Sequence, residues 1–318
     1  MIASSLVAAY LLDAMVGDPP WLPHPVRWIG RVIAWTERGL CMLVQHPLRA
    51  KLAGIGVAVG LPMISSTVVW GSMHVADQLS TPLGQTLEIL WSFLALAGRD
   101  LADHAWAIWR ALNADSLNEA RSAVARIVGR DTHALSEPEV VRATVETVAE
   151  STCDGIVAPL FFLALGGAPL AWAYKTVNTL DSMIGHPERP YRDFGWASAR
   201  LDDAMNWLPA RLTGWLIVSA AGMRFLNLTR AYDAWVVFRR DGGKHRSPNS
   251  GRPEAAMAGA LRVQLGGVNV YDGTAEVRPS IGTADQPLTR DRIAESVAVM
   301  WITSVLAAGL AWGAVWCR

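Results

Sequence analysis

Three carboxylates recur at four-residue intervals in the segment VETVAESTCDG, namely Glu146, Glu150 and Asp154. If the segment is helical, this spacing places them on one face, where like charges repel by roughly 0.2–0.5 kcal/mol per pair. A cation is therefore expected beside them, either arginines on a solvated surface or Mg²⁺, which takes oxygen ligands. The apolar run that follows weighs against a solvated surface, because an unpaired charge near lipid costs roughly 2.5–3.5 kcal/mol.

A second polar group follows that apolar run, in the stretch YKTVNTLDSMIGH. Helical spacing puts Lys175, Asn178 and Ser182 on one face, with Asp181 beside them. This face can form the polar wall of an active site. The alternative is structural: Lys175 extends its charge from the flank of a membrane helix to water, and Asn178 caps that helix.

The third group lies in SARLDDAMNWLPARLTG, where Asp202 and Asn206 are four residues apart. Arg200 and Asp203 are adjacent, and Arg211 follows shortly after. Taken alone, this pattern is typical of a surface salt-bridge cluster. Its carboxylates and guanidinium groups could equally complete a polar site.

A fourth group is the Gly/Ser/Pro-rich basic segment KHRSPNSGRPEAAMAG. Ser247, Asn249 and Ser250 precede a predicted helix that carries Glu254, and backbone N–H groups at a helix start favour anions. The segment is not a Walker A loop, because it lacks GxxxxGK[ST]. A phosphate-binding loop and a mobile surface loop both remain open.

The weakest pattern is GDPPWLPHPVRWIGR, which places His24 and Arg27 after the first apolar segment. A histidine among prolines is more often a turn residue than a ligand or base. By itself, this motif therefore adds only two candidate substrate contacts.

The elements that must position these groups belong to a markedly apolar chain, with 318 residues, 52% hydrophobic and 18% charged. Apolar runs at 52–76 and 296–317 are long enough to cross a hydrocarbon core of about 30 Å. Weaker candidates lie at 2–12, 83–98 and 155–174, whereas 212–223 fits a buried or interfacial helix better. The formal net charge of zero gives no reason to expect nucleic-acid binding.

Lys and Arg counts set the expected orientation, because cytoplasmic loops are enriched in these residues. Five fall in 18–51, six in 99–154 and eleven in 224–292, but none in 71–83. The basic segments are therefore expected on the cytoplasmic side. Since 175–211 is also basic, we expect 155–174 to re-enter the membrane or to be buried in protein, with breaks at Pro159, Gly166, Gly167 and Pro169.

Helical signals dominate the chain. A helix is expected to begin after Ser136 as N-cap, and another to stop at Gly129. No alternating strand pattern longer than a few residues is evident. We therefore predict a predominantly α-helical integral membrane protein, with about four transmembrane helices and a helical, partly membrane-embedded cytoplasmic body.

Four blocks of this sequence resemble the adenosylcobinamide-phosphate synthase family, the membrane enzymes of cobalamin biosynthesis. They are GDP…HPVRWIGR, VRATVETVAESTCDGIVAPLFFLALGGAPLAWAYKTVNTLDSMIG, ARLDDAMNWLPARLTG and SPNSGRPEAAMAGALRVQLGGVNVY. The likeness runs in order over residues 10–285. Three positions depart from the usual family residue. This chain has Ser151 where the family usually has Asn, His186 where it often has Tyr, and Arg262 where it commonly has Gly.

The resemblance implies an ATP-dependent ligase of the inner membrane whose site faces the cytoplasm. It would join aminopropanol or aminopropanol phosphate to adenosylcobyric acid, a corrinoid, with ATP and Mg²⁺ as cofactors. The implied catalytic residues are Glu146, Glu150, Asp154, Lys175, Asp181, Asp202 and Asp203, the first three also as Mg²⁺ ligands. The implied substrate or phosphate contacts are His24, Arg27, Asn178, Ser182, Arg200, Arg211, Ser247, Asn249, Ser250 and Glu254.

The expected organisation is then membrane helices over 1–98 with a cytoplasmic loop at 18–51, a catalytic body over 99–292, and a transmembrane helix over 293–318. Two other classes compete with a ligase. A non-catalytic membrane sensor related to beta-lactamase induction proteins would bind no nucleotide, and a transporter would need more long spans. The sequence leaves the oligomeric state open.

Overall fold

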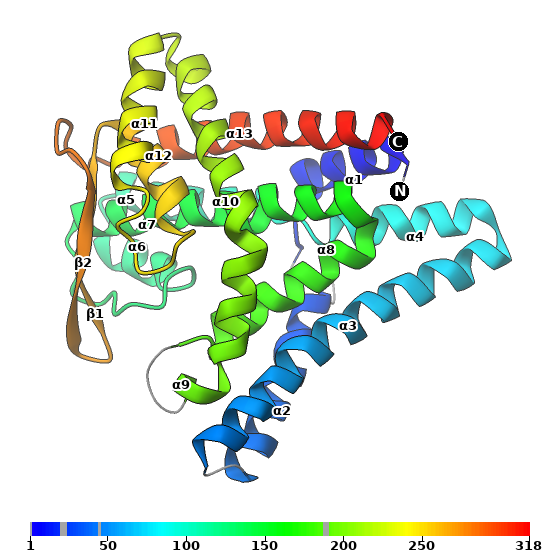
Figure 1. Ribbon diagram of the computed structural model, residues 1–318. Coiled ribbons are helices and arrows are strands. Elements are labelled where there is room, and N and C mark those ends of the chain that lie inside the picture. The colour runs from blue at the N-terminus through cyan, green and yellow to red at the C-terminus, as the bar shows by residue number, and fades with distance from the viewer. Residues whose placement is uncertain (1, 20–23, 44–45, 187–190) are drawn as a thin grey trace. The chain divides into compact units, whose positions relative to one another are not determined.

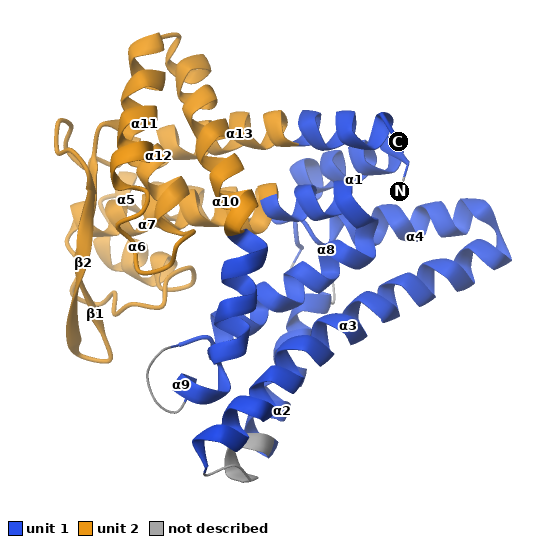
Figure 2. Cartoon of the chain, viewed as in Figure 1, with its two compact units in different colours: residues 1–97, 158–206, 308–318 blue, residues 98–157, 207–307 orange. Residues whose placement is uncertain are grey.

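The computed structural model describes the chain except for residues 1, 20–23, 44–45 and 187–190 (Figure 1). The described residues are mostly helical and divide into two compact units (Figure 2). Unit 1 comprises residues 1–97, 158–206 and 308–318, and unit 2 comprises 98–157 and 207–307. Part of the expected 18–51 loop lies outside the described residues, and the rest includes a helix at 25–43.

Unit 1 is built from the N-terminal helices and the long middle helices. Its elements are α1 (Ala3–Val16), α2 (Pro25–Leu43), α3 (Pro47–Leu79), α4 (Thr81–Phe93), α8 (Ala158–Ile184), α9 (Tyr191–Phe194), the first part of α10 (Trp196–Phe225) and the end of α13 (Asp291–Trp316). Helix α3 packs against α4, α8 and α9. A core of Ile33, Val57, Leu180, Ile184 and Phe194 joins α2, α3, α8 and α9.

Unit 2 combines short helices with a β-hairpin. Its elements are α5 (Gly98–Asn113), α6 (Leu117–Val124), α7 (Glu137–Thr152), η1 (Cys153–Val157), the rest of α10, α11 (Leu228–Asp241), α12 (Gly251–Leu261), β1 (Gln264–Tyr271), β2 (Thr274–Gly282) and most of α13. Helix α12 packs on α7, α11 and both strands. Small residues, Ala221, Ala234 and Ala260, let the helices around α11 approach closely.

Three described helical segments are long and apolar enough to cross a membrane, namely Pro47–Leu79, Glu137–Ile184 and Asp291–Trp316. The helix Ala3–Val16 is apolar but shorter. The two clearest predicted spans are therefore confirmed as helices. The chain is a mostly helical, multi-pass membrane protein.

The long segment through α7, η1 and α8 is not a uniform helix. It begins after Ser136, the predicted N-cap, which forms a capping box with Glu139: Ser136 N and Oγ both donate to Glu139 Oε2, at 2.8 and 2.6 Å. It includes the π-helical turn η1, and breaks where Gly166 and Gly167 leave the helical region, Gly167 at φ 69°. The expected interruption is therefore present, and Pro169 falls near the start of the next helical stretch, where proline is tolerated.

Although no long alternating strand pattern is evident in the sequence, β1 and β2 form an antiparallel hairpin within the otherwise mostly helical fold (Figure 1). Its two-residue turn is Asp272–Gly273, and both residues have positive φ, at 49° and 76°. An Asp-Gly pair favours this turn, since its backbone twist matches that of the strands. Helix α6 also ends at Val124, earlier than the stop predicted at Gly129.

Candidate functional site

In unit 1, α8 and α10 bring together a buried polar group that we call the Asp202 cluster: Tyr174, Asn178, Asp202 and Asn206. Asn206 Nδ2 donates to both carboxylate oxygens of Asp202, each at 3.1 Å, and Asn178 Nδ2 lies 3.3 Å from Oδ1. Tyr174 Oη in turn donates to Asn206 Oδ1 at 2.9 Å, which fixes the amide with its N–H₂ toward Asp202. Within the cluster, the Asp202 carboxylate therefore accepts hydrogen bonds from side-chain amides alone.

The carboxyl group of Asp202 is poised to exchange a proton near neutral pH. Burial and the neighbouring Asp181 raise its pKa to about 7, although the hydrogen bonds from Asn206 and Asn178 favour the charged form. A group that titrates near the working pH is suited to general acid–base catalysis. The predicted surface salt bridge is instead made next to it, by exposed Arg200 with Asp203 at 3.5 Å.

The remaining predicted residues of unit 1 are distributed more widely. Lys175 and Asp181 are half-buried on α8, close in sequence to Asn178. Ser182 is exposed and donates to the Asn178 carbonyl at 2.8 Å, so its hydroxyl serves its own helix. A joint role of Lys175, Asn178 and Ser182 as one polar face stays a prediction.

His24 occupies the start of α2. Its Nδ1 accepts from the Val26 N–H at 3.3 Å, and its Nε2 lies 3.4 Å from Asp18 Oδ1. His24 is buried, whereas Arg27 is exposed one turn further along. The geometry favours a capping role for His24, as its position among prolines suggested.

In unit 2, Glu146 is at the centre of a buried ionic network. Its Oε2 pairs with Arg130, and its Oε1 accepts from Gly266 N at 2.8 Å. The Gly266 N–H is available because a β-bulge between Leu265 and Gly267 interrupts the strand ladder there. Both carboxylate oxygens of Glu146 are thus engaged by protein groups.

Asn269 of β1 completes this network. Its side chain is only 2% exposed, and Oδ1 accepts from Arg130 Nη1 at 2.8 Å and from Arg142 Nη2 at 3.1 Å. Asn269 therefore holds two guanidinium groups beside Glu146. The hairpin contributes to the polar interior of unit 2 through this residue.

Glu254 and Glu150 add further acidic charge to the same unit. Glu254 is buried on α12, and burial, with Glu150 and then Glu146 nearby, raises its pKa well above the ordinary value. His245 faces the same carboxylates, and burial lowers its pKa. We call Glu146, Glu150, His245 and Glu254 the Glu254 cluster.

Asp154, the third residue of the predicted carboxylate face, lies in the π-helical turn η1 and is half-buried. A π turn contains more residues than an α turn, so the simple four-residue spacing does not extend to Asp154. Within the described ranges, no three His, Cys, Asp or Glu side chains are arranged to hold a metal ion. The three-carboxylate Mg²⁺ site therefore stays a prediction.

The loop before α12 is ordered by its own side chains. Ser247 Oγ accepts from the N–H groups of Asn249 and Ser250, at 3.2 and 3.4 Å, and Ser247 N donates to His245 Nδ1 at 3.1 Å. Arg211 Nη1 lies 3.4 Å from Asn249 Oδ1. Burial and the neighbouring Arg252 lower the pKa of Arg211, and two guanidinium groups that repel in this way favour an anion beside them.

Sequence reasoning missed several residues of these networks: Tyr174, Arg130, Arg142, His245, Arg252 and Asn269. His245 and Arg252 lay inside the basic segment that was already singled out, so they could have been found. Arg130 and Asn269 are 139 residues apart, and no local pattern links them. The Asp-Gly turn after Asn269 was the available signal for the hairpin that carries it.

Together these features describe a multi-pass membrane protein with buried titratable side chains and a basic loop before α12. The family model described as CobD/Cbib protein matches residues 6–300. The chain belongs to the CobD/CbiB family of cobalamin biosynthesis proteins.

Individual relatives are similar over nearly the whole chain. The cobalamin biosynthesis protein CobD of Klebsiella pneumoniae is 48% identical over 306 residues, 95% of this chain and 94% of the relative. CobD of Geobacter metallireducens is 47% identical, over 93% of this chain and 91% of its own, and CbiB of Salmonella typhimurium is 44% identical, over 95% and 94%. No solved structure matches the chain significantly.

Proposed function

We propose that this protein is an ATP-dependent amide ligase, which joins aminopropanol or aminopropanol phosphate to adenosylcobyric acid at the cytoplasmic side of the inner membrane. Membership of a cobalamin biosynthesis family supports the pathway. The single observation that most supports amide formation is the buried Asp202 carboxyl group with a pKa of about 7. An amine nucleophile arrives protonated at neutral pH and must lose a proton, which such a group can accept.

The proposed reaction has two balanced steps. An oxygen of the substrate carboxylate attacks the γ-phosphorus of ATP, so that an acyl phosphate forms and ADP leaves. The amine nitrogen then attacks the acyl carbon, the carbon–oxygen bond to phosphate breaks, and inorganic phosphate leaves. Before this attack, ionised Asp202 takes one proton from the ammonium group, and the second proton that the nitrogen loses leaves with the phosphate. Asn206 and Asn178 hold the Asp202 carboxylate in position.

Phosphoryl transfer depends mainly on positioned charge, and we assign this task to charged residues other than Asp202. Mg²⁺ usually binds through one or two carboxylates together with phosphate oxygens, a mode that needs no closed set of three protein ligands. We assign Glu150 and Glu254 to this mode. Burial, with Glu150 and then Glu146 nearby, raises the pKa of Glu254, and a divalent cation would offset the negative charge of these neighbouring carboxylates. When bound, Mg²⁺ would neutralise phosphate charge.

Phosphate oxygens would be bound by Arg211 and by the loop that contains Ser247, Asn249 and Ser250. The N–H groups of Asn249 and Ser250 already bond Ser247 Oγ, so the guanidinium group of Arg211 is the principal donor in this assignment. We further propose that Lys175 stabilises developing negative charge, as its place on α8 beside the Asp202 cluster allows. Glu146, which is fully engaged by Arg130 and Gly266, is assigned a positioning role.

The test uses the full-length protein, purified in detergent and incubated with ATP, Mg²⁺, adenosylcobyric acid and either amine. Mass spectrometry should detect the corrinoid amide, and ADP should accumulate in equal amount. Omission of ATP is the control for the activation step. A folded sample that forms no amide with either amine would reject the ligase assignment and favour a sensor.

A further inference from the structure

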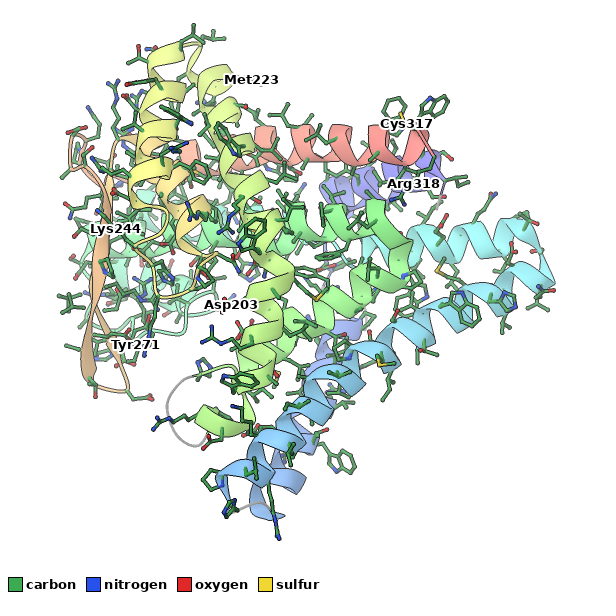
Figure 3. The ribbon with its side chains drawn as sticks, in the orientation of Figure 1. Asp203, Met223, Lys244, Tyr271, Cys317 and Arg318 are labelled. Carbon is green, nitrogen blue, oxygen red and sulfur yellow. The ribbon has the colours of Figure 1, made fainter. Side chains whose placement is uncertain are left out.

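The corner between α10 and α11 in unit 2 exposes large apolar side chains that no described element covers. Leu226 is 93% exposed and Leu228 is 86% exposed. Met223, labelled in Figure 3, and Tyr232 extend this surface along the two helices, at 56% and 62%. We call Met223, Leu226, Leu228 and Tyr232 the α10–α11 corner.

The backbone at this corner adopts a conformation that is costly for a leucine. Leu226 adopts a positive φ of 48°, a left-handed conformation that costs a residue with a Cβ atom roughly 1–2 kcal/mol. Asn227 then caps α11 by accepting from the Thr229 N–H at 2.8 Å. A turn exposed only to water would more commonly place glycine or asparagine at the left-handed position, and a polar residue in place of Leu228.

Two arginines flank the corner, Arg224 and Arg230, and residues 215–232 contain no Asp or Glu. The next residue, Asp233, is a carboxylate that pairs with Arg262. The guanidinium groups of Arg224 and Arg230 lie over the Phe225 ring, at 5.6 and 4.7 Å, so they are held at the edge of the apolar surface. Exposed leucines with tyrosine and arginine at their margin are typical of segments at a membrane–water interface.

The direction of the helices within unit 2 is consistent with this setting. Helix α13 is long and apolar enough to cross a bilayer, and α11 runs across its direction rather than alongside it (Figures 1 and 2). A helix that lies across a spanning helix follows the plane of the membrane. The part of α10 that belongs to unit 2 also exposes tryptophan, at Trp207 and Trp215.

We propose that the α10–α11 corner is a membrane-interface anchor, which inserts its leucines at the boundary between headgroups and acyl chains and binds anionic phospholipid headgroups through Arg224 and Arg230. The anchor is independent of the ligase reaction. It ties unit 2 to the bilayer surface at a place other than the spanning helices.

A spin label tests the environment of the corner directly. Leu228→Cys is labelled in a full-length protein that carries Cys41→Ser and Cys317→Ser, with buried Cys153 retained, in nanodiscs containing phosphatidylglycerol. Power saturation should show greater access to O₂ than to a water-soluble nickel chelate. The matched control is Val277→Cys on β2, an exposed valine at 77%, where the order should reverse.

Two results would overturn the proposal. Nickel access at 228 as high as at 277 would place the corner in water, and low access to both reagents would show that protein covers it, such as a second copy. Met223→Cys provides a second label position on α10 if the first variant does not fold. Nanodiscs of phosphatidylcholine alone should lower the O₂-to-nickel ratio at 228, and an unchanged ratio would reject the role of anionic headgroups.

Discussion

Arg130 and Glu146 form a buried ion pair, with side chains only 6% and 7% exposed, although one lies in a loop and the other within α7. The remaining oxygen of Glu146 accepts from the Gly266 N–H of β1, and Arg130 also donates to Asn269. The pair therefore holds a loop, a helix and a hairpin together. A carboxylate so completely engaged is better suited to hold structure than to bind a metal ion.

Replacement of Glu146 by glutamine should accordingly destabilise the fold. The variant leaves the Arg130 charge buried without its partner, and loss of one member of a buried pair typically costs about 3–5 kcal/mol. Thermal unfolding in detergent should show a clearly lower midpoint. The double variant Arg130→Met/Glu146→Gln should lose less than the sum of the single variants, whereas additive losses would show that the pair is not coupled.

Asp202 should give both stability and activity a specific pH dependence. In the folded protein its pKa is about 7, whereas an unfolded aspartate has a pKa near 4. Between about pH 4 and pH 7 folding therefore takes up a proton, so the free energy of unfolding falls as the pH rises and then levels off. Asp202→Asn removes this term, and its midpoint relative to wild type should increase from pH 5 to pH 8.

Catalysis should show the opposite trend, because only ionised Asp202 can accept a proton. Wild-type turnover should rise with pH around 7, and Asp202→Asn should lose about 100-fold or more, the usual range for a general base. Glu119→Gln, a change of an exposed carboxylate on α6, is the control for both measurements. An unaltered stability profile in Asp202→Asn would show that Asp202 does not titrate near 7.

The features that could be predicted from the sequence involve residues that are close together in the chain. Ser136 and Glu139 form a capping box because the two residues are three apart on one helix, and Gly166–Gly167 break α8 because glycine tolerates non-helical backbone. Asp202 and Asn206 were likewise visible as neighbours on one helix face. In each case the interacting groups lie within about one helical turn, so spacing alone determines their approach.

The features that sequence could not predict depend on distant partners. The sequence around Glu146 does not reveal its partners, because only the fold brings Arg130 and Gly266 next to it. The π-helical turn η1, which contains Asp154, likewise interrupts the α-helical spacing, and no local sequence pattern marks it. The hairpin could have been inferred from Asp272–Gly273, but its contribution of Asn269 to the buried network could not.

Glu150 and Lys175 are the residues whose charge we expect to matter for the reaction rather than for the fold. Glu150→Gln and Lys175→Met should each leave the protein expressed in the membrane but reduce turnover by at least about 100-fold, as loss of preorganised electrostatic groups often does. Product formation per folded protein, with the thermal midpoint measured in parallel, separates the two effects. Wild-type turnover in either variant would remove that residue from the site.

Arg262 stands where the family pattern has glycine, and its contacts show how the larger side chain is accommodated. It follows α12 in the left-handed conformation, with φ 57° and ψ 38°, where glycine is the usual residue. Its guanidinium group pairs with Asp233, the Nε–Oδ2 distance being 2.6 Å. The ion pair thus offsets part of the cost that a side chain incurs in this conformation.

The two contributions can be separated with Arg262→Gly and Arg262→Ala. Both variants lose the contact with Asp233. Only glycine removes the roughly 1–2 kcal/mol cost of the left-handed backbone, and its greater conformational freedom in the unfolded chain offsets part of that gain. We therefore expect Arg262→Gly to be more stable than Arg262→Ala by about 1 kcal/mol. Denaturant unfolding in detergent measures the difference, and an alanine variant as stable as the glycine variant would show that the left-handed backbone carries no cost here.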